Sequence, residues 1–204
     1  MRSNIAVVIL LLSTLTACDV DQTKEVPKKG AALFEKLDPQ SSGVTFANNL
    51  HEDSVINYFT YPYIYMGGGV ATGDVDNDGL ADIYFSANME PNRLYLNQGN
   101  LKFEDITETS GVASDDRWVT GVSMADVNGD GWMDIYVSVS GKFATRKNQL
   151  FINQGLDQGG VPTFVEEAGE RGVDDEGSTT QGTFFDYDND GDLDLYLANY
   201  PFTA

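Results

Sequence analysis

Three nine-residue stretches of this chain share one pattern: Asp74-Val-Asp-Asn-Asp-Gly-Leu-Ala-Asp82, Asp126-Val-Asn-Gly-Asp-Gly-Trp-Met-Asp134 and Asp186-Tyr-Asp-Asn-Asp-Gly-Asp-Leu-Asp194. Each stretch has oxygen-bearing side chains at positions 1, 3, 5 and 9, and a glycine at position 6 that permits a sharp backbone turn. Calcium takes about six to eight oxygen ligands, and alternate positions of a tight loop can direct them at one centre. The pattern therefore predicts three calcium sites, one in each loop.

The predicted ligands recur at the same loop positions, so the chain is expected to bind up to three Ca²⁺ ions. Position 7 is Leu80, Trp132 or Asp192, and this variety is expected if the backbone carbonyl, rather than the side chain, binds the ion. The side-chain ligands are Asp74, Asp76, Asp78 and Asp82 in the first loop, Asp126, Asn128, Asp130 and Asp134 in the second, and Asp186, Asp188, Asp190 and Asp194 in the third.

The acidic loops have two other interpretations. An EF-hand needs a glutamate at loop position 12 and flanking helices, but position 12 is Phe85, Val137 or Leu197, and each loop runs into a β-branched and aromatic stretch typical of a strand. An Asp/Asn/Gly hairpin turn without an ion is the second alternative. Recurrence of the pattern at matching positions in three copies favours the metal sites.

The excess of acidic residues also favours bound cations. The chain has 204 residues, 32 acidic and 12 basic, for a formal net charge of −20. Eleven of the carboxylates lie at predicted ligand positions, distributed four, three and four among the loops. Such clustered negative charge opposes compaction unless cations neutralise it. It also argues against nucleic acid as a partner, because nucleic-acid-binding surfaces carry clustered Lys and Arg.

The N-terminal region has the layout of an exported protein. Residues 1–18 carry Arg2, then an apolar run, and end in Leu15-Thr16-Ala17-Cys18, which resembles a bacterial lipoprotein box. The resemblance implies that Cys18, the single cysteine, becomes lipidated, that residues 1–18 are a lipoprotein signal peptide, and that the chain is attached to a membrane of the bacterial cell envelope. The composition of residues 19–42 predicts a polar tether, and the alternative is a short helix at Ala31–Leu37.

The stretch between the tether and the first loop is expected to be strand-like. Residues 42–49 and 56–66 have strand composition, and the second is rich in aromatic side chains that either pack on a core or form a ligand platform: Tyr58, Phe59, Tyr61, Tyr63 and Tyr65. The only histidine, His51, is expected in a solvated loop.

From Gly67 onward the chain is repetitive. A short Gly-rich strand, the acidic loop and an Ile/Leu-Tyr strand are followed by a third strand ending in Asn-Gln-Gly and a fourth that begins near Phe103 or Phe164. Length differences between the units fall in the connections, as in repeated supersecondary units. The units are 67–117, 118–178 and a truncated 179–204. Four strands per unit predict an all-β fold, a partial β-propeller over 43–204 with an incomplete ring.

These segments resemble the FG-GAP or VCBS repeats of integrin-α-type propellers, in the branch of bacterial lipoproteins related to cartilage acidic protein (ASPIC/UnbV-type). The resemblance rests on three segments: Gly67–Gly79, Trp118–Asp126 and Phe184–Asp194. It implies blades with calcium-binding hairpins, and a ring of about seven blades. We therefore expect this chain to be the N-terminal part of a longer protein.

For function, the resemblance implies a calcium-stabilised, membrane-anchored, extracytoplasmic binding or adhesion scaffold that is not an enzyme in this segment. No nucleophile–base pair is evident, and the carboxylates are accounted for by calcium. The alternative is a polysaccharide-associated module whose catalytic or binding domain lies beyond residue 204. The partner, protein or glycan, stays open, and the acidity argues against the RNA binding sometimes ascribed to the family.

Overall fold

The computed structural model describes residues 34–114, 117–141 and 145–201. It divides into two units, 1–36 and 37–204. Only residues 34–36 of the first are described, and they contain no helix or strand. The predicted signal peptide, Cys18 and most of the tether lie outside the described residues. Within the described ranges, helices are four residues long, and none has the length and apolarity needed to cross a membrane.

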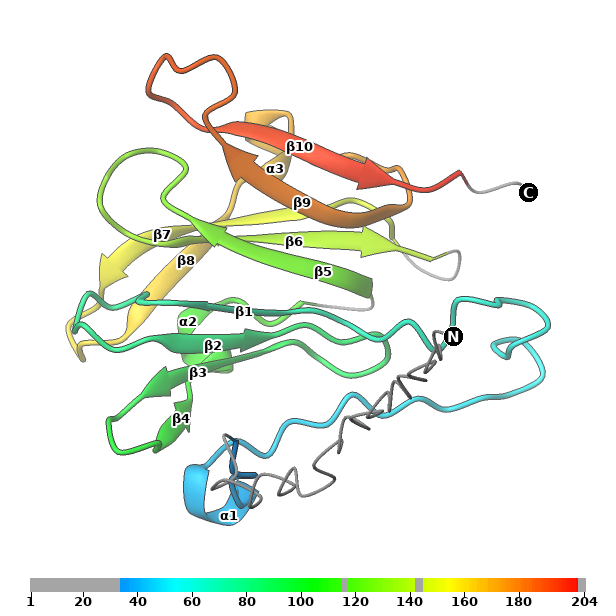
Figure 1. The fold of residues 1–204 in the computed structure, drawn as a ribbon, viewed down its shortest axis with the longest axis horizontal. Coiled ribbons are helices and arrows are strands. Elements are labelled where there is room, and N and C mark those ends of the chain that lie inside the picture. The colour runs from blue at the N-terminus through cyan, green and yellow to red at the C-terminus, as the bar shows by residue number, and fades with distance from the viewer. Residues whose placement is uncertain (1–33, 115–116, 142–144, 202–204) are drawn as a thin grey trace, which may run out of the picture. The chain divides into compact units, whose positions relative to one another are not determined.

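The second unit contains three antiparallel sheets in chain order (Figure 1). The first is β1 (Val70–Gly73), β2 (Asp82–Phe85), β3 (Arg93–Asn97) and β4 (Phe103–Asp105). The second is β5 (Trp118–Ala125), β6 (Asp134–Ser140), β7 (Gln149–Leu156) and β8 (Pro162–Glu166). The third is β9 (Thr179–Phe185) with β10 (Asp194–Asn199). Sheets one and two are meanders, each followed by a one-turn helix, α2 (Thr107–Ser110) or α3 (Ala168–Arg171).

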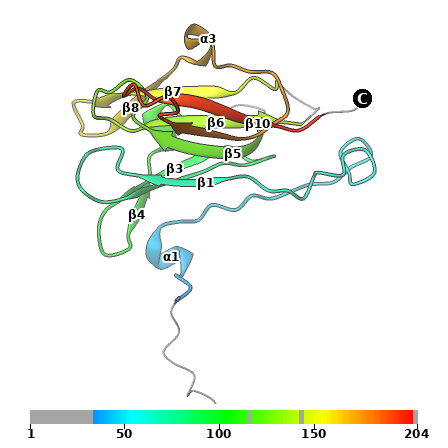
Figure 2. The same ribbon diagram turned by 45° about the horizontal axis from the view of Figure 1, so that its top comes forward.

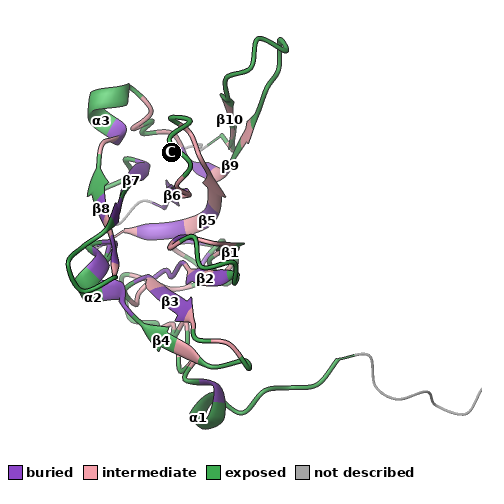
Figure 3. Cartoon of the chain, turned by 90° about the vertical axis from the view of Figure 1, so that its left-hand side faces the viewer, coloured by how far each residue is buried: buried purple, intermediate pink, exposed green. Residues whose placement is uncertain are grey.

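The sheets stack through their first strands, β1 against β5 and β5 against β9. Gly121 of β5 allows this close approach, because a Cβ there would lie 2.3 Å from Oε1 of Gln181 and 2.5 Å from the carbonyl oxygen of Thr180. The main apolar core lies between the first two sheets and includes Val75, Tyr84 and Val137. Burial is greatest in β6 and least in β10, which pairs only with β9 in the described chain (Figure 3).

This architecture confirms the sequence prediction of an all-β, propeller-like fold with four-stranded units and three equivalent hairpins side by side. The short Gly-rich strand predicted at the start of each repeat is present as β1, β5 and β9.

The segment before β1 corrects the prediction of strands at 42–49 and 56–66, since turns and irregular backbone occupy both (Figure 2). Asp53 Oδ1 accepts the N–H groups of Val55 and Ile56, and Asn57 Oδ1 accepts that of Phe59. Side chains thus satisfy backbone donors that a strand would pair with a neighbour. The helix of this region is α1 (Pro39–Ser42), capped by Asp38, while Phe34–Leu37 is not helical.

The aromatic residues of this segment do not form the packed face of a strand. Tyr61 is 1% exposed and makes an edge contact with Trp118, their ring centroids 5.3 Å apart. The other four are exposed: Tyr58, Phe59, Tyr63 and Tyr65. The alternation of a strand does not apply, because the chain turns at each of the four exposed aromatic residues. His51 is exposed, as predicted.

Candidate metal centres

The three acidic loops connect the first two strands of each sheet, β1 to β2, β5 to β6 and β9 to β10 (Figure 1). We call them loop 1 (74–82), loop 2 (126–134) and loop 3 (186–194). Because the three hairpins stack side by side, the loops lie at corresponding ends of successive sheets. Each turns through residues with positive φ at positions 4 and 6, such as Asn77 (59°) and Gly79 (89°) in loop 1.

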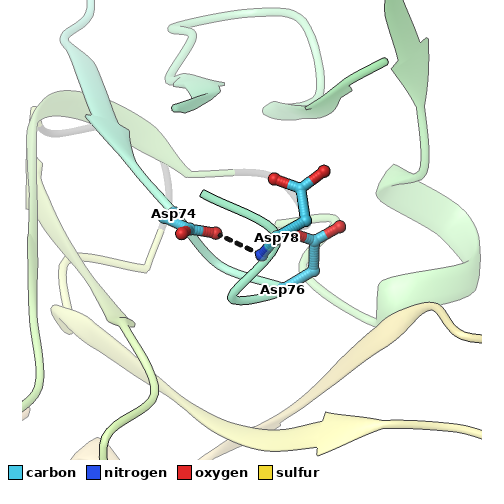
Figure 4. Close-up of side chains that lie close together, drawn as sticks. All are labelled: Asp74, Asp76 and Asp78. Atoms are coloured by element: carbon cyan, nitrogen blue, oxygen red, sulfur yellow. Dashed lines mark hydrogen bonds between the residues drawn. The ribbon is translucent and has the colours of Figure 1, made fainter. Parts of the chain in front are cut away.

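Loop 1 brings three predicted ligands together. Carboxylate oxygens of Asp74, Asp76 and Asp78 lie within 4.8 Å of one another (Figure 4). The two oxygens of Asp74 accept the N–H groups of Asp78 (3.1 Å) and Gly79 (2.9 Å), so the loop wraps around this side chain. Asp76 Oδ1 accepts the same Asp78 N–H at 3.1 Å. The convergence of three carboxylates is therefore imposed by the loop backbone.

The carboxylate at position 9 has a different environment in loops 1 and 2. Asp82 is 1% exposed, and its oxygens accept the N–H groups of Val75 and Asn97, each at 2.8 Å. Asp134, also 1% exposed, accepts those of Val127 and Asn153. Each side chain joins the start of its loop to the third strand of its sheet. In loop 1, Asp82 lies outside the group of three carboxylates.

Loop 3 has another grouping. Asp186, Asp188 and Asp194 converge within 4.8 Å, and Asp190 lies outside that group. Asp194 is exposed, and its Oδ2 accepts the N–H of Tyr187 at 2.8 Å. Position 9 therefore belongs to the carboxylate group of loop 3, unlike Asp82 in loop 1.

In loop 2, an amide replaces one carboxylate. Asp126 accepts the N–H groups of Gly129, Asp130 and Gly131, the same wrapping as in loop 1. Asn128 donates Nδ2–H to Asp130 Oδ2 at 2.8 Å, which relieves the repulsion that a second carboxylate would add. Loop 2 is thus the least charged of the three.

The residues at position 7 behave alike in all loops. The N–H groups of Leu80, Trp132 and Asp192 each donate to Oδ1 of the position-5 aspartate, at 2.7, 2.9 and 3.1 Å. The backbone is therefore held in one conformation whatever the side chain, as expected if the backbone provides the ligand. Binding of an ion by these carbonyl oxygens stays a prediction.

Burial and mutual repulsion disturb the ionisation of the acidic residues. Burial raises the pKa of Asp82 to about 6, with the charges of Asp76 and Asp74 adding to the effect. Burial likewise raises the pKa of Asp76 and of Asp134, and neighbouring aspartates contribute in each case. In loop 3, a hydrogen bond with Asp190 raises the pKa of Asp192, while the N–H of Asp192 lowers that of Asp190. A cation would relieve this repulsion.

The donor set fits a hard divalent cation. Oxygens that share one calcium ion at roughly 2.4 Å cannot be more than about 4.8 Å apart, and two of the loops meet that limit with three carboxylates each. Asp74, Asp76 and Asp78 would hold the ion in loop 1, and Asp186, Asp188 and Asp194 in loop 3. In loop 2, Asp126, Asn128 and Asp130 occupy the corresponding positions.

Sequence reasoning missed the asparagines around the loops. Asn97 donates its backbone N–H to Asp82 and its Nδ2–H to the carbonyl oxygen of Ala81, and Asn153 makes the same two contacts in the second sheet, to Asp134 and Met133. The signal was present in the repeated Asn-Gln-Gly at the end of each third strand. The role of this asparagine is evident only in the structure, where β3 and β7 lie beside their loops.

A polar groove of about 380 Å³ lies beside loop 2. Its wall includes Trp132 and Asp130 from the loop, Gln154 from β7, and Glu167 and Arg171 near α3. The last two form an ion pair at 2.8 Å. Loop 1 has Leu80 where loop 2 has Trp132, so the aromatic wall is particular to the second unit.

Comparison with known proteins agrees with this geometry. Residues 74–137 match the family model described as an FG-GAP-like repeat. Human cartilage acidic protein 1 is 32% identical over 136 residues, covering 65% of this chain and 20% of that protein. The protein of the same name from Xenopus tropicalis is 32% identical over 103 residues, covering 50% and 15%. Mouse integrin alpha-8 is 27% identical over 177 residues, covering 79% and 15%. The chain thus spans a fifth or less of the length of these relatives.

Proposed function

We propose that this chain, which carries FG-GAP-like repeats of the integrin-like family, forms a calcium-stabilised part of a membrane-anchored scaffold for extracellular binding or adhesion. The observation that carries the calcium assignment is the convergence of three carboxylates in loop 1 and again in loop 3. The partner recognised by the scaffold is a protein or a glycan, and we assign it no catalytic step.

The loops have a structural task in this proposal. Each connects the innermost strand of a sheet to the next strand, and Asp82 and Asp134 extend the connection to the third strand. Bound calcium supplies positive charge and fixed coordination at the turn. The aspartates at positions 1, 3 and 5 of loop 1 and at positions 1, 3 and 9 of loop 3 bind it, while Asp82 and Asp134 hold the sheet register. A loaded loop would thus make each four-stranded unit more rigid.

The hydrogen bonds of the loop carboxylates and the position of the single histidine support a non-catalytic role. In the described chain, the first aspartate of each loop (Asp74, Asp126 or Asp186) accepts backbone N–H groups, which restricts its use as a free acid or base. His51 is exposed in the segment before β1. We assign membrane attachment to lipid on Cys18, and the location to the bacterial cell envelope, on the lipoprotein-box resemblance alone.

Calorimetric titration of the full chain with Ca²⁺ tests the calcium assignment. We expect saturable binding at up to three sites, with dissociation constants of roughly 10⁻⁴–10⁻³ M, the range of extracellular calcium modules. Magnesium is the control ion, because it requires a smaller, near-octahedral cage. Absence of calcium heat together with an unchanged thermal melt in chelator would reject the assignment.

A second candidate function, attachment to a polysaccharide, is favoured by the groove beside loop 2. An indole face, an amide, carboxylates and a guanidinium line it, and these groups can stack on a sugar ring and hydrogen-bond to its hydroxyls. Replacing Trp132 with leucine, the residue at this position of loop 1, should abolish retention on an oligosaccharide array while leaving the calcium titration unchanged. Equal retention of both proteins would remove this candidate.

A further inference from the structure

Two asparagine side chains connect loop 1 to loop 2. Asn77 of loop 1 donates Nδ2–H to the carbonyl oxygen of Gly131 in loop 2, at 3.1 Å. Asn153 of β7 donates Nδ2–H to the carbonyl oxygen of Val75 in loop 1, at 2.9 Å. The two contacts join residues 54 and 78 positions apart in the sequence. The loops of neighbouring sheets are thus one hydrogen-bonded assembly.

The first contact joins the two metal centres directly. Asn77 lies between Asp76 and Asp78, which both belong to the carboxylate group of loop 1. Gly131 lies between Asp130 and Trp132, the residues at positions 5 and 7 of loop 2. Donor and acceptor are therefore each flanked by predicted ligands. Any ordering of one loop by an ion also positions its half of this hydrogen bond.

The second contact provides a rigid support. Asn153 is 1% exposed and donates Nδ2–H to the carbonyl oxygen of Met133 at 3.1 Å as well as to that of Val75. Its backbone N–H donates to Asp134 at 2.8 Å. One buried residue therefore holds position 2 of loop 1 and positions 8 and 9 of loop 2. A shift in either loop changes the contacts available to the other.

We propose that loops 1 and 2 bind calcium cooperatively, with Asn77 as the coupling residue. The inference rests on the proposed calcium sites and adds an energetic link between two of them. An empty loop must lose conformational freedom when it binds an ion. If its neighbour is already ordered, the hydrogen bond from Asn77 is partly in place, and the second ion binds at a lower entropic cost.

Loop 3 lacks the same link to loop 2. Position 4 of loop 2 is Gly129, which has no side chain to reach forward. Asn189 occupies position 4 of loop 3 with φ 64°, close to the 59° of Asn77, and in the described chain its side chain has no hydrogen bond to another loop. Cooperativity carried by position 4 is therefore confined to loops 1 and 2.

The second loop contains its own spectroscopic probe. Trp132 and Trp118 are the two tryptophans of the chain, and Trp118 lies at the far end of β5 from loop 2. Terbium, a hard trivalent cation of similar size to calcium, luminesces when a nearby excited indole transfers energy to it. Excitation of tryptophan in the full chain during a terbium titration therefore reports the sites close to Trp132. The Asp130→Ala variant, which lacks a ligand in loop 2, gives the part of the signal that comes from loop 1 and is subtracted.

The decisive experiment is a double-mutant cycle read at loop 2. Asp78→Ala removes a ligand from loop 1, and we expect it to weaken terbium binding at loop 2 about five-fold, the effect of one net hydrogen bond. In the Asn77→Gly background the same change should have an effect of about two-fold or less. Glycine is natural at this position in loop 2, so the backbone geometry is retained. Asp188→Ala in loop 3 is the matched ligand deletion and should leave loop 2 unchanged.

A gain-of-function variant provides the converse. Gly129 has φ 73° and open space where a Cβ would lie, so Gly129→Asn should fold and offer an amide toward loop 3. In this variant, Asp188→Ala should then weaken terbium binding at loop 2. Terbium binding at loop 2 that is indifferent to Asp78→Ala would overturn the coupling while leaving the calcium sites intact. No terbium luminescence and no calcium heat in any variant would overturn both the coupling and the proposed calcium sites.

Discussion

The backbone N–H of Asn153 donates to Oδ1 of Asp134 at 2.8 Å, and this hydrogen bond attaches the third strand of the second sheet to the end of its metal loop. Oδ2 of the same carboxylate accepts the N–H of Val127 at 2.9 Å. Asp82 repeats the arrangement with Asn97 and Val75. The ninth residue of the loop therefore has a structural role that does not depend on a bound ion.

Asp134→Ala should destabilise the protein even without metal. It leaves two N–H groups without their acceptor, at about 1–3 kcal/mol each when buried, so we expect a loss of roughly 2–5 kcal/mol. Urea denaturation in chelator measures it. Asp130→Ala, at an exposed position of the same loop, is the control and should cost under about 1 kcal/mol in chelator. Equal losses in the two variants would contradict the assignment of Asp134.

Calcium should raise the melting temperature through the loops. A ten-fold excess over the dissociation constant adds about 1.4 kcal/mol per site if only the folded state binds. Asp78→Ala should abolish the contribution of loop 1, whereas Asp192→Ala should change little, because its side chain lies outside the carboxylate group of loop 3. Loop 2 should bind most weakly, since it has three charges at the ligand positions rather than four. If Asp192→Ala matched Asp78→Ala in thermal melts, the ligand assignment would be wrong.

The metal-free protein should become less stable as the pH rises through about 6. The folded-state pKa of Asp82 is about 6, above its ordinary value of 3.8, so the folded state binds the proton more tightly than the unfolded state. Its contribution is fully present below about pH 4 and is lost by pH 7. The raised pKa of Asp76 and Asp134 acts in the same direction.

Unfolding free energies in chelator at pH 5 and pH 7 measure this effect, which we expect to be on the order of 2 kcal/mol. Saturating calcium provides the comparison. Protons compete with the ion for the carboxylates, so the loss of stability with rising pH should diminish or reverse when calcium is bound. A metal-free protein that is more stable at pH 7 than at pH 5 would refute the prediction.

Close contact between β5 and β9 should make Gly121 intolerant of a side chain. In Gly121→Ala the new Cβ would lie 2.5 Å from the carbonyl oxygen of Thr180, so backbone must move, at roughly 1–3 kcal/mol. Gly159→Ala is the matched control, because its nearest neighbour, at 3.2 Å, is the side chain of Asp157 in an exposed turn. Thermal melts should separate the two variants clearly, and similar melting temperatures would count against the stacked arrangement.

Cys18 should carry the lipid anchor. Cells expressing the full chain and labelled with a clickable palmitate analogue should show a labelled wild-type protein and an unlabelled Cys18→Ser variant. The chain has no other cysteine, so the substitution breaks no disulfide. Equal labelling of both proteins would end the lipoprotein assignment.

The sequence determined by itself the three loops, the four-stranded repeat and the all-β class. Each of these features follows from residues close together in the chain: alternating oxygen ligands around a glycine, then a stretch of β-branched and aromatic residues. The exchange of Leu80, Trp132 and Asp192 at position 7 was already interpretable in this way, because the N–H of each makes the same hydrogen bond within its loop.

Only the tertiary structure decided which carboxylates converge in each loop and which hydrogen bonds connect one loop to the next. Asp82 and Asp194 occupy the same loop position, yet Asp82 accepts the backbone N–H of Asn97 from the third strand, whereas Asp194 converges with Asp186 and Asp188 in its own loop. The contact from Asn77 to Gly131 depends on the stacking of two sheets. Residues 42–49 and 56–66 have strand composition but form no strand, and around the second stretch the side chains of Asp53 and Asn57 accept backbone N–H groups that a strand would pair with a neighbour.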